Sequence, residues 1–174
     1  AKRSALDEEK RLARQAEEVK RVRAAEAEAE SRRALMREES RKAELARSLL
    51  RLERTYANIG NAPRSEELWA EAIGLLEAGE PGPELALAYA YRSGTLMVAD
   101  RFAEGEDWAR RALELADACG AEDAAIYALN TLGICRGFLG DRTGELSLRE
   151  SLARAQAAGR EYEAGRAYTN LACL

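Results

Sequence analysis

Histidine is absent from the 174 residues of this chain. Without an imidazole the chain can form neither a Ser-His nor a Cys-His nucleophilic pair, and it lacks the commonest general base at neutral pH. It also lacks the G-x-x-x-x-G-K-[ST] loop that cradles phosphate groups, and no carboxylate pair accompanies a matching nucleophile. We therefore expect a protein that is not an enzyme, with no catalytic residue, no metal site and no cofactor.

Cysteine is scarce as well. The chain has three, Cys119, Cys135 and Cys173, which are widely spaced and form no C-x-x-C pair. An odd number of dispersed thiols favours a reduced, cytoplasmic protein over a disulfide framework or a zinc site. We expect each of the three to be a small buried hydrophobic side chain.

Long apolar runs and charge of one sign are also missing. No segment approaches the roughly 18 to 20 apolar residues that cross a bilayer, and the first residues carry charge instead of the apolar block of a signal peptide. The 27 Lys/Arg and 31 Asp/Glu residues are mixed along the chain, with a net charge of -4. A nucleic-acid surface needs an excess of clustered basic residues. We therefore expect no membrane contact and no direct binding of nucleic acid.

Glycine and proline are absent from residues 5–59, which consist mainly of Ala, Glu, Arg, Leu and Lys. These residues lose little entropy in a helix, so a long charged helix is predicted. Acid-before-base pairs such as Glu28 and Arg32 support it. Its heptad seam is interrupted by Glu26 and Arg33, which leaves three possibilities open: a solvated helix, a coiled coil that makes a homo-oligomer, or local disorder near the start.

The rest of the chain repeats itself at intervals of about forty residues, which indicates stacked helix pairs. Three similar stretches begin at Gly60, Asp100 and Gly140, and each leads into an apolar helix. The predicted organisation is a charged helical extension over residues 1–44, which can continue into the first repeat helix, and a repeat array over residues 45–174. The units of the array are about 45–79, 84–120, 122–159 and a half repeat at 161–174.

These units resemble tetratricopeptide repeats (TPR). The residues that carry the resemblance are Gly60, Ser65 and Ala72 in the first unit, Asp100, Phe102, Gly105 and Ala112 in the second, and Leu132, Gly133, Gly140 and Leu152 in the third. Small side chains there allow paired helices to approach closely. The resemblance implies an all-α fold, a TPR-like solenoid of antiparallel helix pairs preceded by the long charged helix. Arg92 replaces a usual Leu and Glu145 a small residue, so the middle units are expected to be irregular.

More specifically, residues 82–89, 97–102, 128–133 and 165–172 are similar to the repeat region of large ATP-binding LuxR-type bacterial transcriptional regulators. In that family the repeats lie between a nucleotide-binding switch domain and a helix-turn-helix domain, and they sense a ligand or a protein. The chain has no phosphate loop and no recognisable helix-turn-helix, so ATP binding and DNA binding are not carried over.

The resemblance therefore implies the sensor or interaction region of a cytoplasmic signalling or transcriptional regulator, whose partner is a protein or peptide. The alternative is a structural adapter whose charged N-terminal helix oligomerises or docks a partner. The chain starts without Met and stops in the middle of a repeat, which suggests a fragment of a longer protein.

In such repeats the first helix of each pair lines the concave face, where ligands bind. The candidates on this face are Arg47, Arg54, Asn58, Met97, Tyr127, Asn130, Phe138 and Arg166. Amide side chains can hold the backbone of an extended peptide, and arginines can receive its acidic groups. The alternative for each is a packing or solvated role. In that case Arg92 and Arg166 would pair with neighbouring glutamates, and Trp69 and Trp108 would pack between helices.

Overall fold

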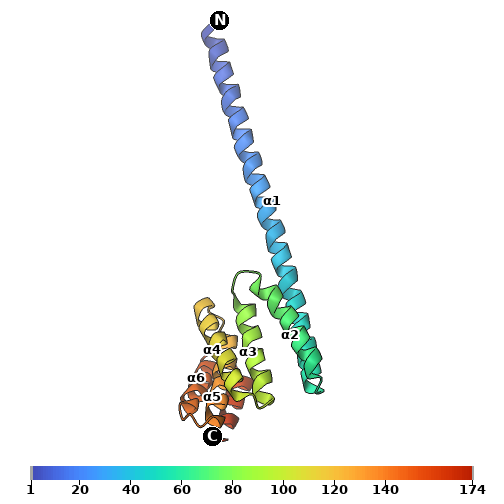
Figure 1. Cartoon of the computed structure of the whole chain (residues 1–174). Coiled ribbons are helices and arrows are strands. Elements are labelled where there is room, and N and C mark those ends of the chain that lie inside the picture. The colour runs from blue at the N-terminus through green and yellow to red at the C-terminus, as the bar shows by residue number, and fades with distance from the viewer. Residues whose placement is uncertain (1, 174) are drawn as a thin grey trace. The chain divides into compact units, whose positions relative to one another are not determined.

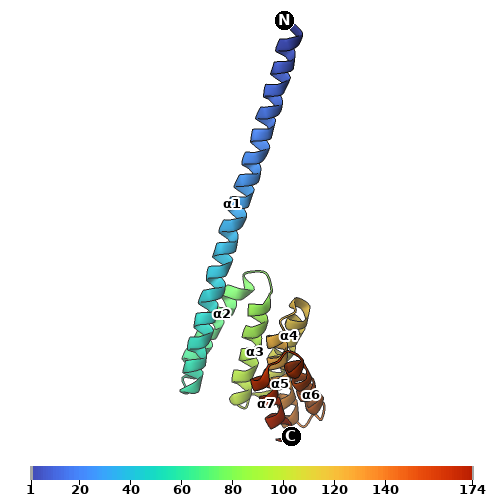
Figure 2. The same cartoon turned by 180° about the vertical axis from the view of Figure 1, so that it is seen from behind.

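The structure, a computed structural model, describes residues 2–173 and places the side chains of residues 11, 12 and 14–173. Its regular elements in that range are all α-helices, which confirms the predicted all-α class (Figure 1 and, from behind, Figure 2). None of the helices described is long and apolar enough to cross a membrane. The elements are α1 (Lys2–Asn58), α2 (Ala62–Glu77), α3 (Pro83–Val98), α4 (Phe102–Cys119), α5 (Glu122–Phe138), α6 (Gly144–Ala157) and α7 (Glu161–Leu171).

The chain divides into two compact units, residues 1–41 and residues 42–174. This division lies close to the boundary predicted between the charged extension and the repeat array. The first unit is helical, and its described side chains are all exposed, including the apolar Leu12 and Met36. Self-association through this helix stays a prediction.

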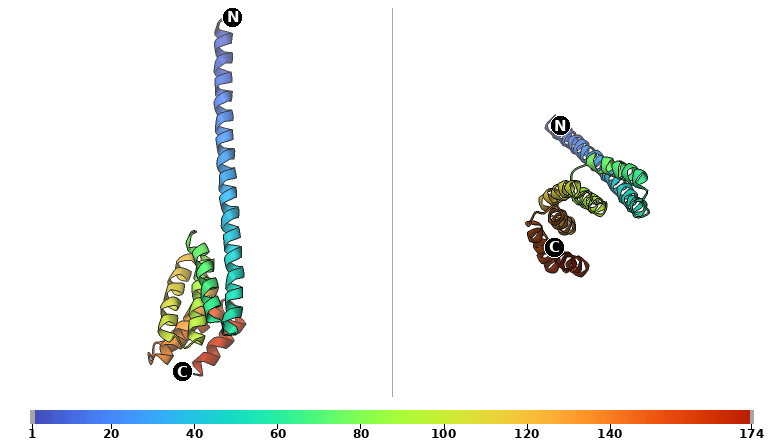
Figure 3. Two further views of the ribbon diagram at one scale, coloured as in Figure 1. Left: turned by 45° about the vertical axis from the view of Figure 1, so that its right-hand side comes forward. Right: turned by 60° about the horizontal axis from the view of Figure 1, so that its bottom comes forward.

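The second unit is built from antiparallel helix pairs. The last turns of α1 pair with α2, α3 pairs with α4, α5 pairs with α6, and α7 packs beside α6 (Figure 3). Each pair has one apolar stripe, which it buries against the neighbouring pair. This is the helix-pair solenoid predicted from the forty-residue repeat.

The period reflects a backbone requirement at the turn inside each pair. Gly60 and Gly140 have φ of 78° and 84°, and Asp100, at the equivalent position between them, has φ of 57°. Glycine takes this left-handed conformation without a steric penalty, and aspartate is among the few other residues that tolerate it. A turn residue of this kind therefore recurs about every forty positions.

Small residues bring the two helices of a pair together. A Cβ on Gly133 would lie 2.7 Å from the carbonyl oxygen of Gly144, and a Cβ on Gly105 would lie 3.3 Å from the carbonyl oxygen of Ser93 on α3. The third unit also has a small residue at this contact, although the sequence analysis expected it at Glu145. The residue is Gly144, one position before the exposed Glu145. The spacing of this unit therefore differs by one residue, but its helices make the same close contact.

Larger side chains fill the spaces between pairs. The rings of Trp69 on α2 and Trp108 on α4 meet edge to face with centroids 4.9 Å apart, which supports a packing role for both. Cys135 is buried and Cys119 half-buried, but Cys173 is exposed. The prediction of three buried thiols is wrong for Cys173, because this residue follows the last turn of α7 and lies outside the helix packing.

Candidate functional site

A pocket of about 750 Å³ opens between the first helix pair and α3. All of its walls belong to the second unit: the last turns of α1, parts of α2, α3 with the turn that follows it, and one side chain of α5, Tyr127. Apolar side chains contribute much of the lining, namely Leu50, Ala57, Leu76, Leu87, Ala88 and Leu96. The pocket thus combines an apolar lining with several charged side chains, an arrangement typical of ligand sites.

Three arginines form one wall. Arg47, Arg51 and Arg54 are spaced i, i+4 and i+7 along α1, so they project from one face of the helix. Each is exposed, and none of them forms an ion pair with any side chain that the structure describes. These guanidinium groups are therefore available to an acidic ligand.

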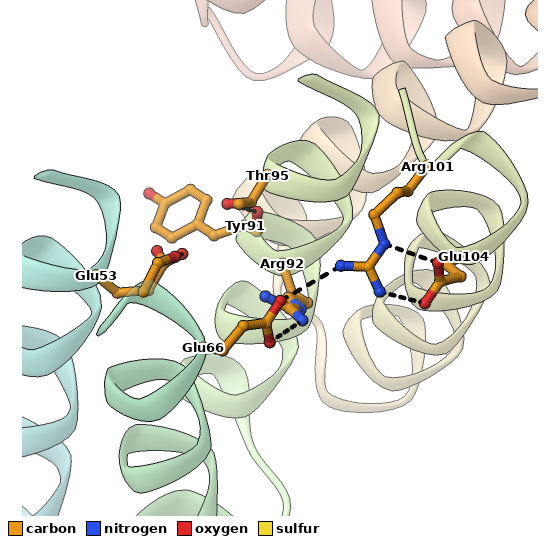
Figure 4. Close-up of polar contacts among 8 residues, drawn as sticks. Glu53, Glu66, Tyr91, Arg92, Thr95, Arg101 and Glu104 are labelled. Atoms are coloured by element: carbon orange, nitrogen blue, oxygen red, sulfur yellow. Dashed lines mark hydrogen bonds and ion pairs between the residues drawn. The ribbon is translucent and has the colours of Figure 1, made fainter. Parts of the chain in front are cut away.

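The opposite corner of the pocket holds arginines that are already paired (Figure 4). Glu66 on α2 accepts hydrogen bonds from the buried Arg92 on α3 and, at 3.4 Å, from Arg101. Arg101 also donates from Nε and Nη2 to the two carboxylate oxygens of Glu104, at 2.7 and 2.6 Å. The guanidinium carbon of Arg92 lies 4.6 Å from the ring centroid of Trp69. The predicted pairing of Arg92 with a glutamate is confirmed, and this network holds α2 against α3.

A buried carboxyl group lies between the arginine wall and this network. Glu53 is 3% exposed, and its Oε1 accepts a 2.8 Å hydrogen bond from the hydroxyl of Ser65. Burial raises the pKa of Glu53, while the bond from Ser65 and the charge of Arg92 oppose that rise. The positions equivalent to Glu53 in the second and third units, forty and eighty residues further on, are the small residues Ser93 and Gly133. In the first pair, the hydrogen bond between Ser65 and Glu53 therefore replaces the contact that small residues make in the later pairs.

Two tyrosines, Tyr91 of α3 and Tyr127 of α5, also line the pocket. The rings of Tyr91 and Tyr127 meet edge to face with centroids 5.2 Å apart. Gly94 leaves room for this pair, since a Cβ there would lie 2.5 Å from the Tyr127 hydroxyl oxygen. Burial raises the pKa of Tyr91, as does the neighbouring Tyr127, and the positive charge of Arg54 opposes both.

Four of the eight residues predicted from the sequence line this pocket: Arg47, Arg54, Asn58 and Tyr127. The structure brings them together from α1 and α5, which are far apart in the chain. The expectation of a shared face for these four agrees with their positions, whereas their role in binding stays a prediction.

The other four lie elsewhere. Met97 is half-buried at the end of α3, and Phe138 is 64% exposed and stacks on Phe102 with ring centroids 4.7 Å apart. Asn130 is 2% exposed, and its Oδ1 accepts a 2.8 Å hydrogen bond from Asn170 on α7. The guanidinium of Arg166 covers the ring of Tyr127, with 4.2 Å from its carbon to the ring centroid.

Sequence reasoning missed Arg51, Glu53 and Tyr91. Arg51 was detectable, because it stands one helical turn after Arg47 on the face already assigned to binding. Glu53 carried a weaker signal, a charged residue about one period before Ser93. Tyr91 had no signal, since its inward direction depends on how α3 faces the first helix pair. In the described part of the chain, no group of three acidic or cysteine side chains is placed to hold a metal ion.

No protein-family model matches this chain, and neither does any curated protein. Among solved structures, the chain is similar to the crystal structure of aspartyl phosphate phosphatase F from Bacillus subtilis, with a TM-score of 0.67 and 12% sequence identity. The match covers 75% of this chain and 34% of that one, so the chain spans about a third of the length of the protein it resembles. At this identity the likeness supports the helical-repeat fold alone.

Proposed function

We propose that this chain is a non-catalytic helical-repeat module that binds an extended acidic segment of a protein partner in the pocket between the first helix pair and α3. One observation carries the proposal: three arginines without an ion-pair partner among the described side chains line one wall of a pocket with an apolar lining. An acidic peptide would place carboxylates on Arg47, Arg51 and Arg54 and lay its apolar side chains on the apolar lining.

Aromatic and polar groups fit the same occupant. Tyr91 and Tyr127 offer flat faces for a peptide, and Asn58 and Thr95 offer groups that can bond its backbone. Because the pocket lies between two helix pairs, an occupant would contact both and favour one angle between them. Binding would thereby shift the population of conformations that differ in this angle, and this shift would act on a neighbouring domain.

The wider role that we propose is the sensor or interaction region of a cytoplasmic signalling or transcriptional regulator. Two observations support it: the resemblance of the repeats to those of LuxR-type regulators, and the helical-repeat fold shared with a bacterial aspartyl phosphate phosphatase. Protein recognition by an extended concave surface is the common use of such solenoids.

The test compares two fluorescent peptides by anisotropy: one alternating Glu with small apolar residues, and one with Gln in place of Glu. We expect the acidic peptide to bind more tightly, and its affinity to fall as salt is raised. Changing Arg47, Arg51 and Arg54 together to Gln should weaken binding about tenfold, at about 0.5 kcal/mol for each exposed ion pair.

A matched control changes three exposed arginines on or near other helices, Arg110, Arg142 and Arg149, to Gln, which alters the net charge equally. This control variant should bind the acidic peptide nearly as well as the unchanged chain. Equal binding of the Gln peptide, or an equal loss in the control variant, would refute a specific acidic site in this pocket.

A further inference from the structure

Three hydrogen-bond donors are buried without an acceptor at the seam between α5 and α7. They are Nε and Nη2 of Arg166 and Nδ2 of Asn130, and none has a partner among the described residues. Buried polar groups are nearly always hydrogen-bonded, and a guanidinium donor left alone is among the least favourable exceptions. All three groups are donors, so what is missing at this seam is an acceptor.

Two contacts one helical turn apart bring these donors to the same seam. The guanidinium of Arg166 lies over the ring of Tyr127, and Asn170 donates to Oδ1 of Asn130 at 2.8 Å. Stacking on the ring uses the flat face of the guanidinium and leaves its edge free. The bond from Asn170 occupies the oxygen of Asn130 and leaves its NH₂ group free.

The same edge of arginine binds a carboxylate elsewhere in this protein. Arg160 donates from Nε and Nη2 to the two oxygens of Asp123, at 2.7 and 2.8 Å, and Arg101 does the same to Glu104. Arginine binds carboxylates and phosphates by this two-point geometry, and both examples in this chain are carboxylates. Arg166 presents the equivalent edge, and in this case the edge is buried and unmatched.

The carboxylates nearest along the two helices do not supply the acceptor. Asp123, one turn before Tyr127, is taken up by Arg160, and Glu163, one turn before Arg166, forms no ion pair with Arg166 in the described structure. Neither of these two carboxylates therefore accepts from the edge of Arg166 in the described structure.

We infer that the α5–α7 seam is a carboxylate-binding site, in which Arg166 grips both oxygens by its Nε–Nη2 edge and Asn130 donates a third hydrogen bond. Tyr127, on whose ring the guanidinium of Arg166 lies, also lines the pocket, so the two sites share this side chain. It is a separate site, because neither Arg166 nor Asn130 lines the pocket.

The test follows the Nε–H signal of Arg166 and the Nδ2 signal of Asn130 by ¹⁵N NMR on the full chain. Four probes are titrated: a blocked peptide with one Glu, the same peptide with Gln, a Gln peptide with a free C-terminal carboxylate, and inorganic phosphate. We expect the Glu peptide to move both signals and the blocked Gln peptide to move neither. The free-terminus peptide tells a chain-end carboxylate from a side-chain carboxylate, and phosphate tells a planar oxyanion from a tetrahedral one.

Arg166→Lys keeps the charge and the long stem but removes the edge, and it should weaken binding of the Glu peptide at least tenfold. Arg160→Lys is the matched control, with the same change at an edge already bonded to Asp123, and it should bind normally. Circular dichroism checks that both variants fold.

The inference fails if Arg166 does not respond to any carboxylate, if phosphate binds better than both carboxylate peptides, or if Arg166→Lys binds as well as the unchanged chain. Arg51→Gln changes the pocket but not the α5–α7 seam, so this variant should keep the NMR response of Arg166. The two proposals can therefore fail independently.

Discussion

Replacing Gly133 by Ala should destabilise the chain, because α5 and α6 approach each other closely at this glycine. A Cβ at this position would lie 2.6 Å from Cγ of Leu148 and 2.7 Å from the carbonyl oxygen of Gly144. Ordinary contacts are about 3.5 to 4 Å, so α6 must move by about 1 Å. Leu148 can rotate, but Gly144 presents backbone and cannot yield without shifting the helix.

The magnitude follows from two opposing effects. Overpacking a core typically costs about 1 to 3 kcal/mol, and here the obstacle is backbone, which favours the upper end. Replacing a helical glycine by alanine returns about 0.5 to 1 kcal/mol. We expect Gly133→Ala to lower the free energy of unfolding by about 2 kcal/mol, measured by urea denaturation followed by far-UV circular dichroism.

Gly74→Ala is the matched control, since Gly74 is an exposed helical glycine on α2 with nothing within 4 Å of the added Cβ. The control should stabilise the chain by about 0.5 to 1 kcal/mol, because the entropic gain is unopposed. If Gly133→Ala were as stable as Gly74→Ala, the close approach of α5 and α6 would be refuted.

Two further predictions concern buried titratable groups. Burial raises the pKa of Glu53 above its ordinary 4.5, so the folded chain keeps this proton at pH values where the unfolded chain has lost it. Its contribution to stability is therefore complete below pH 4.5 and is lost as pH rises through the raised pKa. Glu53→Gln, which keeps an acceptor for Ser65, should flatten that loss in urea titrations at several pH values; parallel pH curves would contradict it. Burial raises the pKa of Cys135 to about 11, so iodoacetamide at mildly alkaline pH should label the exposed Cys173 first and Cys135 after unfolding. Peptide mass spectrometry checks the order, and early labelling of Cys135 would contradict it.

The sequence was sufficient to predict the helices and their pairing. Long runs without glycine or proline, ended by Gly60, Gly120 and Gly159, determine where helices form and stop, because these effects are local to the backbone. The recurrence of the turn every forty residues or so then requires stacking, since no single pair can cover its own apolar stripe. The one-residue slip at Gly144 was visible only as an irregular spacing.

The sequence was less informative about the site. It placed Arg47 and Arg54 on a common helix face, since both belong to one helix and periodicity alone decides their direction. It could not show that Asn130 is buried against Asn170, or that the edge of Arg166 has no acceptor. Those facts depend on how α7 packs against α5, a contact between segments about forty residues apart.

By itself, then, the sequence determined an all-α chain of stacked helix pairs without histidine chemistry, because composition, turn residues and helical period act over short distances. Only the tertiary structure decided that a pocket remains between the first helix pair and α3 and which arginines line this pocket. It also decided which polar groups already have a hydrogen-bond partner. Hydrogen bonds such as that of Ser65 with Glu53, and the ion pair of Arg92 with Glu66, join different helices. Their geometry exists only once the pairs have packed.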